Sequence, residues 1–224
     1  MLEYLAGRFI ESGWDVRALH RLIVLSRTYR LANDTMDAKQ HPWAQKAMDR
    51  DPENRLLWRH AKRPMDAESL RDSILSISGL LDRKIPKEHP FPPVDSWGFT
   101  IHNPFHGVYD SKHRSVYLMQ QRNRKNAYLS LFDGADPNLS VDERKPTTTP
   151  TQSLFLMNSP LVHLASESLA KQLTESTQDP SNRLRELYRK TLGRPPSDQE
   201  QKDCIDFLKA YSDQQARVAT AQAQ

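Results

Sequence analysis

The segment FDGADPNLSVDERKPTTTPTQSLFLMN, residues 132–158, concentrates side chains that could do chemistry. Two carboxylates, Asp133 and Asp136, stand close to the amide of Asn138, and Arg144 follows a few positions later. A carboxylate in a cleft can act as a general acid or base, and a guanidinium grips planar anions through paired hydrogen bonds. The same residue types also stabilise turns, because short Asp and Asn side chains bond to nearby backbone amides. The segment therefore predicts either a ligand site or an ordinary turn that enters a helix.

A metal site gains little support from the residue types. The turn at 133–144 has oxygen ligands but lacks the glycine and the final glutamate of an EF-hand loop. His102, His106 and His113 lie in a proline-rich stretch, and Pro104 prevents HNPFH from placing two imidazoles on one helix face. We expect solvated or stacked loop histidines at these positions and no metal ion.

Several classes of function are excluded or disfavoured by what the chain contains. Cys204 is the single cysteine, so the chain cannot form an internal disulfide, a thiolate zinc site or a CxxCH haem attachment. GxSxG, GxGxxG and Walker-type loops do not occur. The net charge of +4 is spread along the chain, so we expect no nucleic-acid partner. No apolar run approaches the roughly eighteen residues of a membrane span, so none is expected.

Helical periodicity and helix caps dominate the chain. We expect a mainly α-helical single domain over residues 1–212, followed by a polar tail at 213–224. A capping box of Thr149 and Gln152 predicts the start of a helix that Ser159-Pro160 restarts or kinks. The other expected helices are 2–11, 15–29, 67–81, 126–132, 180–192 and one after the Ser197-Glu200 capping box. The stripe expected to face the core in the 67–81 helix consists of Leu70, Ile74, Ile77 and Leu81.

Two segments depart from the helical pattern. Residues 82–113 carry prolines, glycines and aromatic residues, which exclude long helices and central strands and predict a long irregular loop. Residues 114–121 alternate in the manner of a strand, with Val116 and Leu118 facing one way. We therefore expect a minor β-strand or hairpin near 114–121.

Seven phrases, in order along the chain, carry a resemblance to a known family. They are SGWDVRALHRLIVLSRTYR at 12–30, DPENRLLWR at 51–59, AESLRDSIL at 67–75, RSVYL at 114–118, FDGADPN at 132–138, TTTPTQSLFLMNSP at 147–160 and LYRKTLGRPPSDQE at 187–200. Together they resemble the planctomycete cytochrome-associated C-terminal domain, the domain of unknown function family 1553, truncated on its N-terminal side.

The resemblance implies a context more than a chemistry. Members are typically large exported proteins, often with a c-type cytochrome-like domain and a further domain before this one. It therefore implies an exported, periplasmic or cell-envelope location, and partners that are upstream domains or another chain. No cofactor is expected in this chain, since haem would sit in a partner domain. The motif residues of the family correspond here to Arg114, Asp133, Asp136, Asn138, Arg144, Thr148, Thr149 and Gln152.

The leading hypothesis is a non-catalytic binding or scaffolding module that presents residues 114–149 as a polar cleft for acidic or sulfated glycans. One alternative is a polysaccharide hydrolase that uses Asp133 or Asp136, which requires a carboxylate buried in a cleft with a raised pKa. Another alternative is an accessory domain of a c-type cytochrome electron-transfer protein. The residues assigned to ligand binding are Arg114, Arg122, Asp133, Asp136, Asn138, Arg144, Thr148, Thr149 and Gln152.

Overall fold

The protein is mainly α-helical, as the sequence predicts. The computed structural model describes residues 1–32, 42–61, 63–89, 91–105, 107, 109, 111–140 and 142–222. The chain divides into two compact units, Met1–Pro64 and Met65–Gln224. A single domain over residues 1–212 stays a prediction. No helix in the described ranges is both long and apolar enough to cross a membrane.

The first unit contains α1 (Leu2–Glu11), α2 (Val16–Val24) and α3 (Pro42–Arg50). The carboxylate of Asp15 accepts hydrogen bonds from the backbone N–H groups at Arg17 and Ala18, at 2.8 and 3.1 Å. These bonds satisfy two free donors of the first turn, so Asp15 caps α2 as predicted. The helix ends at Val24, earlier than the expected 15–29 range.

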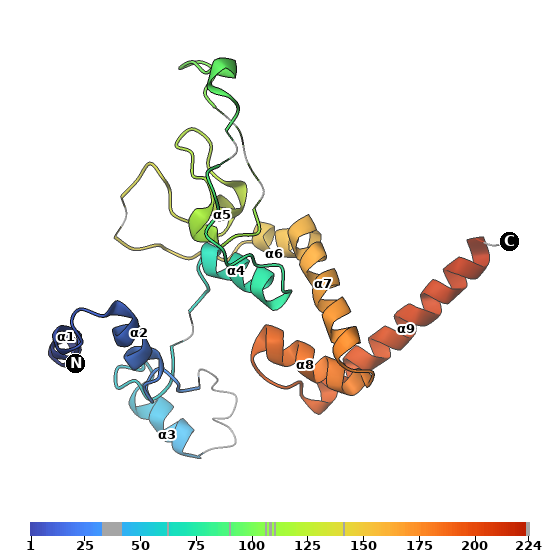
Figure 1. The fold of residues 1–224 in the computed structure, drawn as a ribbon. Helices are drawn as coiled ribbons and strands as arrows, with labels where there is room; N and C mark the ends of the chain where they lie inside the picture. The colour runs from blue at the N-terminus through green and yellow to red at the C-terminus, as the bar shows by residue number, and fades with distance from the viewer. Residues whose placement is uncertain are drawn as a thin grey trace. The chain divides into compact units, whose positions relative to one another are not determined.

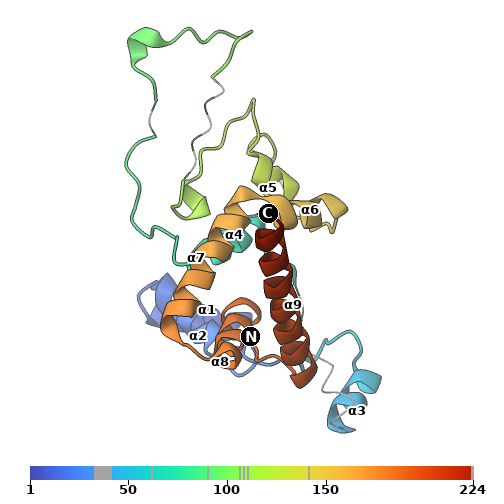
Figure 2. The same cartoon turned by 90° about the vertical axis from the view of Figure 1, so that its right-hand side faces the viewer.

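The second unit is organised around α7, the helix Pro160–Ser176, which contacts α4, α6 and α8. Figures 1 and 2 show this arrangement, with α8 packed near the end of α7 that lies away from α6. The remaining helices of the unit are α4 (Ala67–Ile77), α5 (Ala127–Leu131), α6 (Pro150–Asn158), α8 (Pro180–Leu192) and α9 (Asp198–Gln222). The buried apolar side chains of the unit are Ala67, Leu75, Leu129, Ala165, Leu169, Leu173 and Leu184. Because these residues come from several helices, the core depends on contacts between segments far apart in the chain.

The buried face of α4 differs from the predicted one. Ala67, Arg71 and Leu75 are its buried residues, and the C-terminal capping residue Ser78 is buried as well. The predicted stripe of Leu70, Ile74, Ile77 and Leu81 is only half-buried. The difference arises because Arg71 uses its guanidinium to hold the loop that follows, which turns this face of the helix inward.

The C-terminal end of α4 is fixed to α7 by side-chain hydrogen bonds. The carbonyl of Ser78 accepts from the hydroxyl of Ser168 at 2.8 Å and from Nε2 of Gln172 at 2.5 Å. A carbonyl at a helix end has no partner within the helix, so these donors supply the missing bonds. Gly79 follows with a φ of +70°, a conformation that glycine adopts without strain. One end of the segment that leads to the candidate site is thereby held in place.

In its described residues, the connection from α4 to α5 is irregular, as the prolines predict, apart from two short 3₁₀ turns. These are η2 (Val94–Ser96) and η3 (Ser115–Tyr117). The predicted strand near 114–121 is wrong, because η3 forms over Ser115–Tyr117 within this range. The nearest β-pairing is a single parallel bridge between Asp82 and His113. Alternating apolar residues need a neighbouring strand to form a sheet, and here α4 is the neighbour instead.

The predicted helix boundaries around α6 are confirmed. Thr149 and Gln152 form the capping box, in which each side chain bonds to the backbone of the other residue. Asn158 ends α6 and Pro160 begins α7, so Ser159-Pro160 restarts the helix. In the C-terminal pair of helices, Gly193 ends α8 in the left-handed conformation. The Ser197-Glu200 box also forms, with both reciprocal hydrogen bonds present.

Candidate functional site

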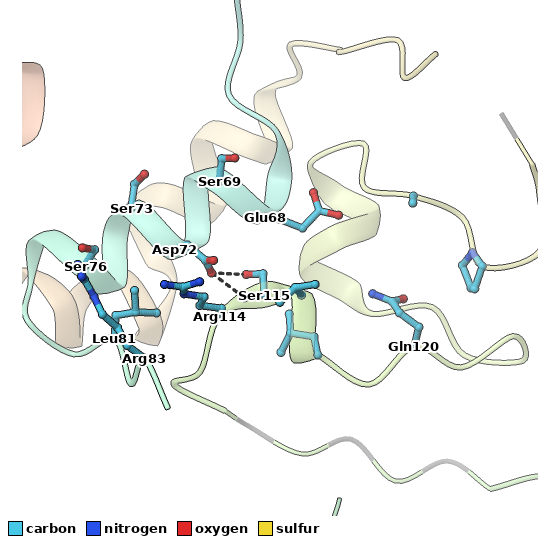
Figure 3. A pocket seen from close by; sticks show the side chains of 14 residues that line it. Glu68, Ser69, Asp72, Ser73, Ser76, Leu81, Arg83, Arg114, Ser115 and Gln120 are labelled. Atoms are coloured by element: carbon cyan, nitrogen blue, oxygen red, sulfur yellow. Dashed lines mark hydrogen bonds between the residues drawn. The ribbon is translucent and has the colours of Figure 1, made fainter. Parts of the chain in front are cut away.

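A cleft of about 800 Å³ lies between α4 and the segment that contains η3. Figure 3 shows serines and acids of α4 on one wall, with Arg114 and Ser115 coming from the η3 segment. The turn that follows α5 completes the lining. The lining residues are Glu68, Ser69, Asp72, Ser73, Ser76, Leu81, Arg83, Arg114, Ser115, Val116, Leu118, Gln120, Ala135 and Pro137.

Two consecutive residues of α4 hold the η3 wall in position. Oδ1 of Asp72 accepts from the backbone N–H and the hydroxyl of Ser115, at 2.8 and 2.7 Å. The buried guanidinium of Arg71 donates to the carbonyl of His113 at 3.0 Å, to the hydroxyl of Ser115 at 3.2 Å and to the carbonyl of Ser111. A buried guanidinium is costly unless its donors are satisfied, and here the returning loop satisfies them. These hydrogen bonds from α4 therefore fix the segment that carries Arg114.

Two arginines on the lining have no protein partner in the described part of the chain. The guanidinium groups of Arg83 and Arg114 form no ion pair or hydrogen bond with another described residue, and both residues are exposed. The hydroxyls of Ser69, Ser73 and Ser76, which also line the cleft, form no hydrogen bond within the same described ranges. The cleft thus presents two cationic forks and several unused hydroxyl groups.

The two acids of the lining are already engaged. Asp72 accepts the hydrogen bonds from Ser115 and lies 3.8 Å from a guanidinium nitrogen of Arg71. Glu68 accepts from Nη1 of Arg144 at 2.7 Å. Partial burial acts to raise the pKa of Glu68, but the hydrogen bonds and the positive charge of Arg144 outweigh it, so the pKa lies below its usual value. The hydrogen bond to Glu68 raises the pKa of Arg144 in turn. The charges of both acids are therefore offset, while those of Arg83 and Arg114 are not.

Asp133, Thr149 and Gln152, from the predicted ligand set, form a connected structural network outside the cleft lining. The carboxylate of Asp133 accepts from the backbone N–H and the hydroxyl of Thr147. Nε2 of Gln152 donates to the carbonyl of Leu131 at 3.0 Å, while its Oε1 accepts from the N–H of Thr149. The network closes the loop between α5 and α6 on itself.

The other predicted residues occupy separate surroundings. Asp136 pairs with Nζ of Lys125 at 2.5 Å, and this hydrogen bond is the main cause that lowers the pKa of Asp136. The amide of Asn138 donates to the backbone carbonyl of Arg122 at 2.9 Å. The side chains of Arg122 and Thr148 are exposed.

The predicted set is thus divided by the fold. Arg114 lines the cleft, and Arg144 reaches it by pairing with Glu68. Asp133, Asp136, Asn138, Thr149 and Gln152 bond to neighbouring residues, whereas the side chains of Arg122 and Thr148 are exposed. Ligand binding by any member stays a prediction. Arg83 and the three serines on the lining were not among the residues predicted to bind ligand. Ser69, Ser73 and Ser76 are four and then three residues apart, a spacing that places them along one side of a helix. This spacing could have indicated from the sequence that the three hydroxyls share one surface.

No group of three or more described His, Cys, Asp or Glu residues is placed to hold a metal ion. His106, one of the three histidines considered above, lies outside the described residues. Nδ1 of His113 lies 3.7 Å from Oδ2 of Asp82. These two residues also form the parallel bridge described above. His102 is exposed.

The arrangement is suited to holding an anion more than to transferring a proton. Its unused groups are cations and neutral hydroxyls, which donate hydrogen bonds to negative oxygens. The acids in its lining have offset charges and one has a lowered pKa, whereas an acid–base catalyst at neutral pH needs a raised one. Asp136, one of the two acids of the hydrolase hypothesis, also has a lowered pKa.

The comparison with family models identifies the class to which this chain belongs. The PSD1 model, described as a protein of unknown function (DUF1553), matches residues 1–208. The chain therefore belongs to this family, as the seven phrases predict. Neither the curated proteins nor the solved structures gave a match.

Proposed function

We propose that the chain is a non-catalytic binding module whose cleft holds an anionic saccharide. The observation that carries the proposal is that Arg83 and Arg114 line one cleft while neither guanidinium pairs with a described residue. A guanidinium forms paired hydrogen bonds with a carboxylate or a sulfate, and two such groups in one cleft favour an anionic ligand.

The charges around the cleft favour the same ligand class. The lining carries two acids and two arginines, and its acids Glu68 and Asp72 are offset by Arg144 and Arg71, which lie outside the lining. Counting these two partners, the group has an excess of positive charge from Arg83 and Arg114. Exposed cations at the mouth of an open cleft attract anions over roughly a Debye length, about 8 Å at physiological ionic strength. The excess predicts binding that weakens as salt is added.

The size and the hydroxyl groups of the cleft suit a saccharide. A volume of about 800 Å³ is in the range of ligand sites and is larger than one sulfate or carboxylate requires. Ser69, Ser73 and Ser76 supply hydroxyls that can donate to and accept from sugar hydroxyls. We therefore infer that the anionic group is carried on an oligosaccharide, with either sulfate or uronic acid as the charged group.

We place this module in an exported protein, where it packs against upstream domains or a partner chain and presents the cleft to acidic or sulfated glycans. This context comes from the family resemblance and is a proposal. No specific observation favours the hydrolase that would use Asp133 or Asp136. None favours the accessory role beside a c-type cytochrome either.

The test is a calorimetric titration of the purified chain with three probes: a heparin-derived hexasaccharide, oligogalacturonate and inorganic phosphate. Arg83→Gln and Arg114→Gln each remove one cation of the cleft. Arg185→Gln is the matched control, because it removes the same charge from an exposed residue of α8 that does not line the cleft. Circular dichroism spectra of all variants check that the helices are intact.

We expect binding of one or both oligosaccharides, weakened about tenfold by either cleft substitution and unchanged by the control, since a hydrogen bond to a charged group contributes about 1.5–3 kcal/mol. Equal affinity in all four proteins would contradict the proposal. Binding that falls equally in the control would show attraction to overall charge and no specific cleft. Binding of phosphate alone would remove the saccharide from the proposal and leave only an anion site.

A further inference from the structure

A second cavity, of about 420 Å³, lies within the irregular connection between α4 and α5. Its walls are mainly aromatic and proline side chains, with one amide among them. The described lining contains no Asp, Glu, Lys, Arg or His. The lining residues are Pro92, Phe99, Asn103, Pro104, Phe105, Gly107 and Tyr109.

The aromatic rings of this segment pack against one another while leaving apolar surface free. Phe99 meets Phe105 in a T-shaped contact with ring centres 5.1 Å apart, and Phe91 lies 5.5 Å from the same ring. Trp97 lies 5.9 Å from Phe99. Trp97 and Phe99 nevertheless remain 50% and 41% exposed. Exposed rings of this number in one short segment point to contact with a further molecule.

Backbone hydrogen bonds hold these rings in position. Thr100 and Asn103 exchange backbone hydrogen bonds of 3.0 and 3.2 Å, which makes a tight turn beside Phe99. Nε1 of Trp97 donates to the carbonyl of Pro92 at 2.8 Å. A Cβ added to Gly107 would lie 2.4 Å from Cζ of Phe105, so this ring packs directly on the glycine backbone. These contacts form one wall of the cavity, in a segment whose described residues contain no long helix.

We propose that this cavity is a second saccharide subsite, which binds the apolar face of a neutral hexopyranose ring. A pyranose carries C–H groups on its faces and hydroxyls around its edge, so it pairs with an aromatic wall and a few polar groups. The side-chain amide of Asn103 forms no hydrogen bond with another described residue and can serve two adjacent hydroxyls. The described part of the lining is uncharged and therefore suits an uncharged part of the ligand.

The two cavities are connected through adjacent residues of the chain. Gln120 lines the arginine-bearing cleft, and Nε2 of the next residue, Gln121, donates to the carbonyl of Gly107 in the aromatic cavity. We infer that one oligosaccharide occupies both cavities, with its neutral ring in the aromatic cavity and its anionic group beside the arginines. This part of the inference rests on the proposed function. Binding of a neutral sugar in the aromatic cavity does not depend on the arginines.

A proline-rich peptide is the other occupant that aromatic walls commonly accept. Such peptides need an extended groove for successive turns, whereas this cavity is bounded by the Thr100–Asn103 turn at one side and uses a single amide. The sugar ring is therefore the better fit, and the peptide becomes one arm of the test.

The experiment is saturation-transfer difference NMR on the whole chain, with cellohexaose, laminarihexaose and mannohexaose as neutral probes and a proline-rich decapeptide as the competing probe. Phe99→Ala removes one ring of the wall, and Phe99→Tyr keeps the ring. Ile101→Ala is the matched control, because Ile101 is 96% exposed on the same turn and does not line the cavity.

We expect transfer to the pyranose C–H protons of at least one hexaose, with affinity reduced about tenfold in Phe99→Ala and kept in Phe99→Tyr and Ile101→Ala. Absence of transfer to all three hexaoses overturns the inference, as does equal binding by Phe99→Ala. Binding of the decapeptide alone overturns it too.

The two proposals fail in different ways. Arg114→Gln is predicted to leave the neutral hexaose signal unchanged, because the arginine lines the other cavity. Loss of anionic binding with retained neutral binding would therefore refute only the proposed function. Retained anionic binding without any hexaose signal would refute only the aromatic subsite.

Discussion

The carboxylate of Asp133 accepts hydrogen bonds from both the backbone N–H and the hydroxyl of Thr147, at 2.6 and 2.8 Å. These residues are fourteen positions apart, so the contact closes the loop between α5 and α6. Asp133 has a φ of +56°, a conformation that Asp and Asn tolerate better than most residues. The carboxylate of Asp133, which the hydrolase hypothesis uses as an acid or base, is thus engaged in holding this loop closed.

Asp133→Ala is expected to lower the free energy of unfolding by about 2 kcal/mol, because two hydrogen bonds to a charged group are lost and alanine is strained at this φ. Asp133→Asn keeps an acceptor and tolerates the conformation, so it is predicted to lose less. Urea denaturation followed by circular dichroism measures both. An alanine variant as stable as the parent chain would show that the contact contributes nothing.

Arg71→Met is predicted to destabilise the chain by about 3 kcal/mol, because the partly buried carbonyls of Ser111 and His113 lose the donor that this buried guanidinium supplies. The connection to α5 should also become more open to proteolysis, since Arg71 holds the place where it returns to α4. Limited digestion with chymotrypsin, followed by mass spectrometry, measures this change, because chymotrypsin cuts after the aromatic residues of the connection and not after Arg or Lys.

Lys87→Met is the control for that experiment, since Lys87 is exposed on the same connection and the exchange is similar in size. The account predicts little change in its stability or digestion pattern. If Arg71→Met and Lys87→Met behave alike, the buried guanidinium does not organise the cleft wall.

The pair of Arg194 and Glu200 predicts an acid-dependent stability. Arg194 bonds to both carboxylate oxygens at 2.8 and 2.7 Å, and this contact, with the N–H of Ser197, lowers the pKa of Glu200 to about 2 from a usual 4.5. A depressed folded-state pKa contributes stability above pH 4.5 that is lost as the pH falls toward 2.

Glu200→Gln is therefore expected to lower the melting temperature at pH 7, and the difference from the parent chain should shrink between pH 4.5 and 2. Glu175→Gln, at an exposed position of α7, is the control. Thermal melts across this pH range check the prediction. A difference that stays constant with pH would exclude the pair as its cause.

Local signals allowed most helix ends to be predicted from the sequence. The caps at Asp15, Thr149 and Gly193 each depend on residues within a few positions, so the sequence pattern contains all that is needed. The residues of α3 were not predicted to form a helix, because Gln45, Lys46 and Asp49 give this stretch the polar composition typical of a loop.

Long-range contacts explain what could not be predicted. The alternation at 114–121 indicates a strand only if another strand lies beside it, but Asp72 of α4 binds Ser115 there instead. Arg83 and Arg114 line the same cleft, although they are far apart in the chain and belong to no shared motif. Pattern analysis finds residues that are close in sequence, and Asp133 and Asp136 stood out for that reason.

The most direct test of the proposed anion cleft is an NMR titration of the arginine Nε–Hε signals with the heparin-derived hexasaccharide. The signals of Arg83 and Arg114 are assigned by their absence from Arg83→Gln and Arg114→Gln, and that of Arg185 by its absence from Arg185→Gln. We predict saturable shifts for Arg83 and Arg114 and none for Arg185, which is exposed on α8 and does not line the cleft. Shifts of Arg185 alone, or no shift at either cleft arginine when the ligand binds, would contradict the proposal.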